Sequence, residues 1–436
     1  MTLARMARLL LPGLGALLLC AGQAGAQKGS FGVRAETVAI LGRLKRGADL
    51  VSAKEQLLRL GLAALPDLFD ILSQGTLPIE GDAPPLSLSQ RVALQGALLG
   101  YPRAELLTLL GRLVRRSSAE RERMAALELL ARAGKKADLK LALELSVLPG
   151  SEEPPGPELR AALENSLSGI AARDPAALRA LADYFARAHP AVHSTIGAVL
   201  ARHGGEQAAE LLTGILGSAG TGADALLLFE IAGLGPEARS SADLVALEKV
   251  RGYLGHPDGG LASLACLAVE HLGDHAAVPE LIVLLEHSDQ NVQRNAYRVL
   301  MALTRLSLEC DPAPWMEWLD RSLDWWELRS EPCRDALLSG SASEAALAVR
   351  EIAEQRLFLD RVAELLVPAL ERPEPDIVQL ACRALGATRL PAARAALFGL
   401  RDHPDARVAE TARATLKKLE RSLSPRARAA RPLVQE

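Results

Sequence analysis

The feature that most constrains the fold is an internal repeat in the second half of the chain. The segment LGHPDGGLASLACLAVEHL, which starts at Leu254, aligns without a gap with LEHSDQNVQRNAYRVLMAL, which starts at Leu285. The same offset of 31 residues relates Ile377, Ala381 and Leu385 to Val408, Ala412 and Leu416. A repeat of this length is typical of an array whose units stack on their neighbours and share one core.

Within each copy the apolar residues follow one face of a helix. They occur at i, i+4, i+7 and i+8, as at Leu261, Ala265 and Val269, whereas a strand would alternate apolar and polar residues. The alanine at i+4 indicates a neighbouring helix that passes too close for a larger side chain. Aliphatic residues and alanine supply nearly all of the 49% hydrophobic content, which also favours closely packed helices.

A second helix precedes each of these, introduced by a glycine turn and often by a proline. Glycine can end a helix in the left-handed conformation, and proline is tolerated in the first turn of the next helix. The pairs of residues that suggest such turns are Gly61 with Pro66, Gly100 with Pro102, Gly273 with Pro279, and Gly386 with Pro391. Capping boxes predict further helix starts at Ser87 with Gln90, Ser117 with Glu120, and Ser341 with Glu344. We therefore expect an all-α chain that forms a right-handed α-solenoid of about nine helix pairs.

The segment LGDHAAVPELIVLLEHSDQNVQRNAYRVLMAL resembles a HEAT repeat, because proline opens its first helix and Asp-x-x-Val-x-x-x-Ala lies in its second. The resemblance is strongest over residues 244–304 and 361–420. HEAT arrays are protein-binding scaffolds, so the resemblance implies a curved recognition surface rather than chemistry. It also implies that Arg294, Arg298 and Arg383, which project away from the apolar stripes, lie on the concave surface, where they would suit an acidic partner.

All four tryptophans, Trp315, Trp318, Trp325 and Trp326, fall in one stretch that begins at Cys310 and ends at Cys333. Their setting, LTRLSLECDPAPWMEWL, resembles a tail that follows the last repeat of many exported bacterial HEAT proteins, where a Leu-Thr-Gly start leads to two tryptophans three residues apart. Arg305 stands here in place of that glycine, and further repeats follow.

Two interpretations of the tryptophans are open. They form a buried mini-core or cap between two arrays, or they are exposed and bind a protein, a sugar ring or a lipid interface. A disulfide between Cys310 and Cys333 would fit the cap and would add about 3 kcal/mol in the chain-entropy model.

The first 26 residues are typical of a signal peptide. Arg5 and Arg8 precede a short apolar segment, and Ala24-Gly25-Ala26 precedes Gln27. We expect cleavage after Ala26 and export to the periplasm or the exterior. Lipid attachment through Cys20 is the alternative, which Leu19 disfavours because the residue before a lipidated cysteine is normally small.

The expected organisation is a signal peptide over residues 1–26, a HEAT-like array over 36–304, a Trp- and Cys-rich cap or spacer over 305–343, a second array over 344–421 and a disordered basic tail over 422–436. After the predicted signal peptide the sequence holds no apolar run long enough to cross a bilayer. The net charge of −3, which becomes more negative without Arg5 and Arg8, disfavours nucleic acid as a ligand.

The sequence contains none of the nucleophile, phosphate-loop or zinc-helix motifs that would indicate an enzyme. We therefore expect a monomeric, non-enzymatic scaffold that binds a protein through its concave face, with no metal or cofactor. The alternatives are a HEAT-like lyase or other enzyme, and carbohydrate or membrane-surface binding through the tryptophans.

Overall fold

The computed structural model describes residues 32–44, 49–79, 83–116, 119–147, 155–234, 244–388 and 390–423. Within these ranges the regular elements are helices, apart from one isolated β-bridge between Thr76 and Pro85. The prediction of an all-α chain is confirmed. The predicted signal peptide and Ser117 lie outside the described residues, as does nearly all of the predicted tail.

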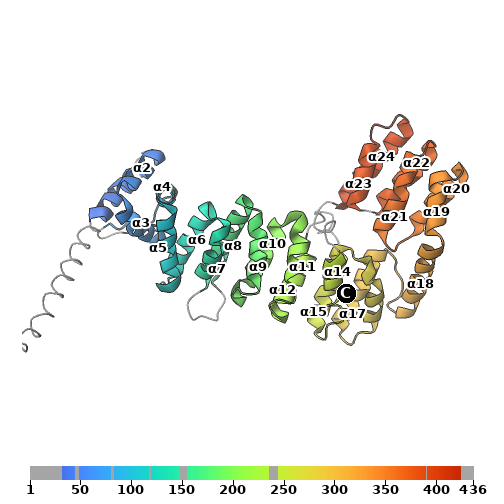
Figure 1. Ribbon diagram of the computed structural model, residues 1–436, viewed down its shortest axis with the longest axis horizontal. Coiled ribbons are helices and arrows are strands. Elements are labelled where there is room, and N and C mark those ends of the chain that lie inside the picture. The colour runs from blue at the N-terminus through green and yellow to red at the C-terminus, as the bar shows by residue number, and fades with distance from the viewer. Residues whose placement is uncertain are drawn as a thin grey trace, which may run out of the picture. The chain divides into compact units, whose positions relative to one another are not determined.

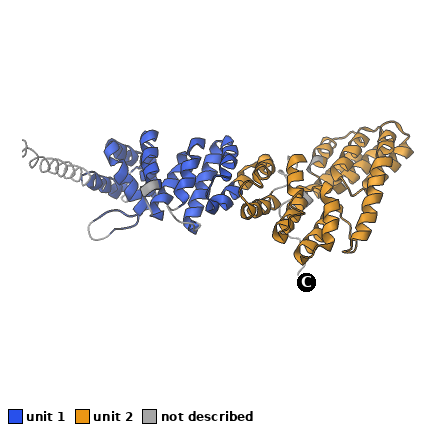
Figure 2. Cartoon of the chain, turned by 60° about the horizontal axis from the view of Figure 1, so that its bottom comes forward, with its two compact units in different colours: residues 1–199 blue, residues 200–436 orange. Residues whose placement is uncertain are grey.

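The chain divides into two compact units, residues 1–199 and 200–436, which Figure 2 colours separately. In the first unit α4 packs on α2, and α8 packs along α6, while α3, α5, α7 and α9 contact these helices from a second layer. A helix over residues 32–44 comes first. The helices that follow are α2 (Leu50–Arg59), α3 (Leu65–Gln74), α4 (Leu88–Leu98), α5 (Arg103–Arg116), α6 (Glu120–Ala133), α7 (Leu139–Ser146), α8 (Pro157–Arg173) and α9 (Ala176–Phe185), with α10 (His193–His203) crossing the boundary.

In the second unit the inner helices again lie side by side, α12 on α15 and α15 on α17, then α20 on α22 and α22 on α24 (Figure 1). The helices that come between them in the sequence contact these side-by-side helices. The bounds are α11 (Ala208–Ile215), α12 (Thr221–Ala232), α14 (Leu244–Arg251), α15 (Gly259–Leu272), α16 (Val278–Val283), α17 (Gln290–Thr304), α18 (Pro312–Leu328), α19 (Ser330–Ser339), α20 (Ala342–Glu354), α21 (Leu359–Leu366), α22 (Pro375–Thr388), α23 (Pro391–Gly399) and α24 (Ala406–Leu423). Each unit is therefore a HEAT-like α-solenoid of stacked helix pairs. The predicted array over 36–304 includes helices of both units.

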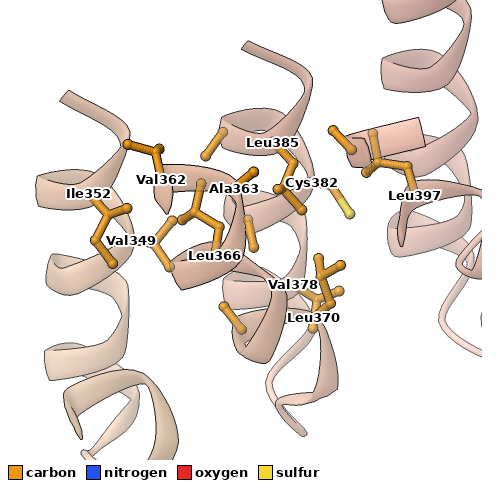
Figure 3. Close-up of a cluster of buried hydrophobic side chains, with 14 of the residues drawn as sticks. Val349, Ile352, Val362, Ala363, Leu366, Leu370, Val378, Cys382, Leu385 and Leu397 are labelled. Carbon is orange, nitrogen blue, oxygen red and sulfur yellow. The ribbon is translucent and has the colours of Figure 1, made fainter. Parts of the chain in front are cut away.

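The repeated stripes form the core. Ile377, Ala381 and Leu385 of α22 are buried, and so are the residues 31 positions later in α24. Figure 3 shows how the core of the C-terminal array is filled by Val349 and Ile352 from α20, Val362 and Leu366 from α21, and Cys382 and Leu385 from α22. One helix cannot bury such a stripe alone, so successive pairs share the core.

Three of the helices are preceded by a histidine and, two residues later, an aspartate, and this spacing has a local cause. In three turns a histidine Nδ1 accepts the backbone N–H of the aspartate two residues later, at 3.0–3.1 Å, and that aspartate accepts an N–H from the first turn of the next helix. The pairs are His256 with Asp258, His287 with Asp289, and His403 with Asp405. The aspartate thus caps the helix that carries the buried stripe.

The predicted glycine turns are correct at some positions and wrong at others. Gly273 ends α15 in the left-handed conformation, with φ of 68°, as expected. Gly100 has no positive φ, and Gly386 lies inside α22 rather than in a turn. Both allow close packing instead, since a Cβ on Gly100 would meet Leu58 and one on Gly386 would clash with Cγ2 of Thr415 in α24. The capping boxes at Ser87 and Ser341 are confirmed.

Arginine side chains join helix ends that are distant in sequence. The fully buried Arg123 of α6 donates to the carbonyls of Leu145 and Val147 at the end of α7, at 2.9 and 2.8 Å. Arg173 donates to Gly134 O just after α6, and Arg372 to Gly340 O just after α19. Carbonyls at a helix end lack intrahelical partners and carry partial negative charge, so they suit a cation.

The C-terminal array ends on a charged surface. The residues of α24 that point away from α22 include Glu410, Arg413, Lys417 and Lys418, all exposed. A polar outer face is what the last helix of a solenoid needs. Among the described residues no helix combines the length and the hydropathy that crossing a bilayer requires.

Candidate protein-binding surface

The inner layer formed by α12, α15 and α17 has one open face. The three helices lie side by side, and the buried residues of each follow one face of the helix. Asn295 of α17 donates to Ser263 of α15, and Arg298 Nη2 lies 3.1 Å from Glu270 Oε2. These polar contacts fix the two helices against each other across the open face.

Two of the three predicted arginines lie on this face. Arg294 and Arg298 are one turn apart on α17 and both are exposed, opposite the buried stripe that includes Val292 and Ala296. The Arg294 guanidinium donates to Asn291 Oδ1 at 2.6 Å, and that of Arg298 is held by Glu270. Among the described residues no carboxylate pairs with Arg294, whereas the charge of Arg298 is paired with Glu270.

Arg383 is also exposed, but it belongs to the C-terminal array, on α22 between α20 and α24. Burial raises the pKa of the neighbouring Cys382 thiol, and the charge of Arg383 partly offsets this rise. Arg383 thus lies on a different set of helices from Arg294 and Arg298.

The open face also carries apolar side chains that the sequence analysis missed. Phe229 of α12 is 65% exposed, and Leu226 one turn earlier is 38% exposed. At about 100° per residue, Phe229, the half-buried Leu267 of α15 and Arg294 of α17 each lie opposite the core side of their helix. The sequence did not indicate that Phe229 is exposed. It ends the run LLLF, and a continuous apolar run does not show which face of a helix is buried.

The four tryptophans lie on a single helix, α18. Trp315 is fully buried, and its indole meets Tyr297 of α17 and Trp318 edge to face, with ring centroids 6.5 and 6.1 Å apart. Its Nε1 donates to Glu309 O at 2.8 Å. The start of α18, a helix of 17 residues, is therefore packed against α17.

The end of α18 packs against the C-terminal array. Trp325 and Trp326 are half-buried against the core of that array, and Trp326 meets Phe358 at 5.9 Å between ring centroids. Trp325 Nε1 donates to Glu351 Oε1 of α20 at 2.8 Å. Trp315 is thus unavailable to a ligand and the other three are partly covered, which favours the mini-core interpretation over an exposed cage.

A polar cluster fixes this junction. The Arg329 guanidinium donates to both carboxylate oxygens of Glu351 at 2.9 Å, and this pairing lowers the pKa of Glu351 to about 2. The buried Cys333 thiol also donates to Glu351, and burial raises the pKa of that thiol to about 11. A thiol held in this state is a weak nucleophile, because only the thiolate reacts readily.

The predicted disulfide is not formed. Cys310 is exposed and free before α18, while Cys333 is buried and free in α19. The 17-residue α18 lies between them and is about 25 Å long at 1.5 Å per residue, whereas a disulfide needs Cα atoms within about 7 Å. A rigid helix replaces the flexible loop on which the disulfide prediction depended.

Arg305 ends α17 in the left-handed conformation with φ of 60°. Its guanidinium donates to Ala387 O and Thr388 O at the end of α22. A glycine would adopt this backbone more easily, but it could not reach α22. The side chain thus provides a link that the resemblance did not predict.

No family model matches the chain, and no curated protein matches it. Among solved structures, an engineered protein matches with 17% identity over 88% of this chain and 99% of its own, with a TM-score of 0.29. Human deoxyhypusine hydroxylase in complex with glycerol matches with 18% identity over 65% and 96%, with a TM-score of 0.24.

Kap121p bound to RanGTP matches with 13% identity over 88% of this chain and 45% of its own, with a TM-score of 0.39. All three TM-scores are below 0.5. These likenesses therefore show no function for this chain.

Proposed function

We propose that this protein is a non-enzymatic scaffold that binds another protein through the open face of its inner helix layer. The observation that carries the proposal is the surface of α12, α15 and α17, where the exposed Phe229 lies on the same face as Leu267 and Arg294. Aromatic residues and arginine are enriched in the energetic centres of protein interfaces, and an exposed phenylalanine on a rigid helix costs little entropy to bind.

The charge on this face defines the partner further. Among the described residues Arg294 donates only to Gln290 O and Asn291 Oδ1 and pairs with no carboxylate, so an acidic side chain of the bound protein would complement it. The apolar contact would be made around Phe229 and Leu226. A partner with an apolar residue beside an acidic one fits this surface.

We further propose that the chain is exported, with cleavage after Ala26, because residues 1–26 have the order of regions that a secretory signal requires. Fractionation of cells that produce the full chain, with N-terminal sequencing of the product, tests this. A cytoplasmic product that retains Arg5 and Arg8 would exclude export.

The scaffold proposal is tested by photo-crosslinking in cells that produce the full chain. A photoreactive phenylalanine is placed at Phe229 and, as a matched control, at Val283, which is 69% exposed on α16 in the other layer. We expect one dominant covalent adduct from position 229 and none from position 283. Arg294→Glu should reduce the yield of this adduct about tenfold, because a tenfold weaker affinity corresponds to about 1.4 kcal/mol of binding free energy. Equal crosslinking at both positions, or none at 229, would contradict the proposal.

A further inference from the structure

The inner helices of the C-terminal array, α20, α22 and α24, form a second open face that the proposed function does not use. α22 packs against α20 on one side and against α24 on the other. Val349 and Ile352 of α20 are buried, and so are Cys382 and Leu385 of α22, each 33 positions later in the sequence (Figure 3). Residues of α20 and α22 that are 33 positions apart therefore lie at equivalent places on neighbouring helices.

Two exposed arginines occupy one such pair of equivalent positions. They are Arg350 of α20 and Arg383 of α22. At about 100° per residue, each lies on the side of its helix opposite the buried residues. Packed helices have axes about 8–10 Å apart, so the two arginines leave the open face about 10 Å from each other.

The last helix, α24, continues this face with two more cations. α24 matches α22 at an offset of 31 residues, and Lys417 and Arg421 are exposed one turn apart. Arg421 lies opposite the buried Ala412 of the same helix. The open face thus carries basic side chains on all three of its helices.

The charges of these four basic side chains are not used within the fold. Among the described residues none of the four forms an ion pair or donates a hydrogen bond. Neighbouring arginines behave differently, since Arg407 Nη1 lies 3.3 Å from Asp376 Oδ1 and Arg329 Nη2 lies 2.9 Å from Glu351 Oε2. An anion could therefore bind the four cations without breaking an existing pair.

An apolar side chain lies beside the cations. Leu347 of α20 is 63% exposed and precedes Arg350 by one turn, so the two side chains share one side of the helix. A ligand that contacts both would need an apolar group next to an anionic one.

The pattern of charge favours separate carboxylates over a continuous anionic surface. Glu354 of α20 and Glu410 of α24 are exposed on the same face. A run of phosphates or a layer of lipid headgroups would meet these two glutamates as well as the cations. Among the described residues this face also lacks the aromatic side chains on which nucleic acid bases stack. A protein segment can place its carboxylates at the cations alone.

We propose that the open face of α20, α22 and α24 binds an acidic segment of a partner protein. The segment lies across the three helices, with carboxylates about 10 Å apart at Arg350 and Arg383 and an apolar residue against Leu347. In an extended chain this spacing corresponds to about three residues. The inference rests on the proposed protein-binding function, but it uses residues of the C-terminal array only and is independent of Phe229.

The first experiment titrates the purified protein into a fluorescently labelled peptide, four repeats of Glu-Gly-Ser, and follows anisotropy at low ionic strength. We expect binding that weakens as salt is added, whereas four repeats of Gln-Gly-Ser should not bind. Arg383→Glu should lower the affinity about tenfold. Arg112→Glu, at an exposed arginine of α5, changes the net charge equally and should leave the affinity unchanged.

The second experiment tests the apolar contact. The Glu-Gly-Ser peptide is extended by one leucine at each end and should bind more tightly than the parent peptide. Leu347→Ser should remove this gain of about threefold and should not change the affinity for the parent peptide. Circular dichroism and the melting temperature show whether each variant is folded.

A third titration examines the last residues of the chain, because residues 424–436 carry three further arginines. A chain that ends at Leu423 should still bind the Glu-Gly-Ser peptide and should still respond to Arg383→Glu. Binding that disappears with residues 424–436 would overturn the inference.

The inference is also overturned if the peptide does not bind, or if Arg383→Glu and Arg112→Glu have the same effect. Tighter binding of an oligothymidine or of phosphatidylglycerol vesicles through Arg350 and Arg383 would assign the face to another class of ligand. A crosslink at Phe229 together with any of these results would leave the scaffold proposal standing. A peptide bound through Arg383 together with no crosslink at Phe229 would instead remove the surface on α12, α15 and α17.

Discussion

The guanidinium Nη2 of Arg305 donates to the backbone carbonyl of Thr388 at 2.6 Å, across 83 residues of sequence. Arg305 ends α17 and Thr388 ends α22, so one side chain connects the helix before the tryptophan segment with a helix of the C-terminal array. The contact requires Arg305 to hold a left-handed backbone, which is unfavourable for a residue with a Cβ. At position 305 the hydrogen bonds to α22 therefore stabilise the fold while the left-handed backbone destabilises it, and substitution separates these two effects.

Arg305→Ala should destabilise the second unit more than Arg305→Gly does. Both variants lose the bonds to Ala387 O and Thr388 O, worth about 2 kcal/mol for a charged donor, but glycine also relieves a backbone cost of about 1 kcal/mol. Urea unfolding followed by tryptophan emission measures this, because all four tryptophans lie in α18. If alanine and glycine are equally destabilising, the left-handed backbone carries no cost at this position.

Glu351 should make the second unit sensitive to acid. Its pKa is lowered from 4.5 to about 2, first by the hydrogen bond from Arg329, so the folded state favours the carboxylate. The stabilisation is then fully present above pH 4.5 and is lost as the pH falls from about 4.5 to about 2. We expect the stability gap between the wild type and Glu351→Gln to close over this window.

The measurement is urea unfolding by tryptophan emission at several pH values, because Trp325 Nε1 donates to Glu351 itself. Glu317→Gln is the control, since Glu317 is an exposed residue of α18 with only a surface pair to Arg321. A gap that stays constant down to pH 2 would show that the pKa of Glu351 is not lowered in the folded protein.

One thiol of the chain lacking residues 1–26 should react under native conditions. Cys310 is exposed, whereas Cys266, Cys333 and Cys382 are buried, and burial raises the pKa of each of these three thiols. Titration with a chromogenic disulfide reagent should give one rapid thiol in the native protein and four after unfolding without reductant. Two thiols after unfolding would instead show that a disulfide forms, and loss of the rapid one in Cys310→Ser would identify it.

Gly386→Ala should destabilise the C-terminal array although alanine is the better helix former by about 1 kcal/mol. The added Cβ would clash with Cγ2 of Thr415 in α24, and overpacking of this kind costs about 1–3 kcal/mol. Thr415→Ala removes that methyl group, so the double variant should recover the loss and gain from helix propensity. Thermal unfolding by circular dichroism tests the pair, and an unrescued double variant would place the clash elsewhere.

Much of the fold was available from the sequence because its signals are local. The stripe at Leu261, Ala265 and Val269 predicts which face of a helix is buried, and the structure buries all three. The capping boxes at Ser87 and Ser341 predict helix starts through contacts within three residues. In the His-x-Asp turns the contact is between residues only two positions apart, since the aspartate N–H donates to the histidine Nδ1. Such contacts are made whatever the rest of the chain does.

The tertiary structure decided what depends on residues far apart in sequence. The sequence placed Arg294 and Arg298 on an outward face, but Phe229 became part of that face only because α12 packs against α15. Trp325 donates a hydrogen bond to Glu351, 26 residues later in the sequence, and Gln95 donates one to Glu128, 33 residues later. The disulfide prediction also depended on two residues far apart in sequence, and a continuous α18 holds Cys310 and Cys333 apart. Helix periodicity shows which side chains point outward, and only the packing of helices determines which of them meet.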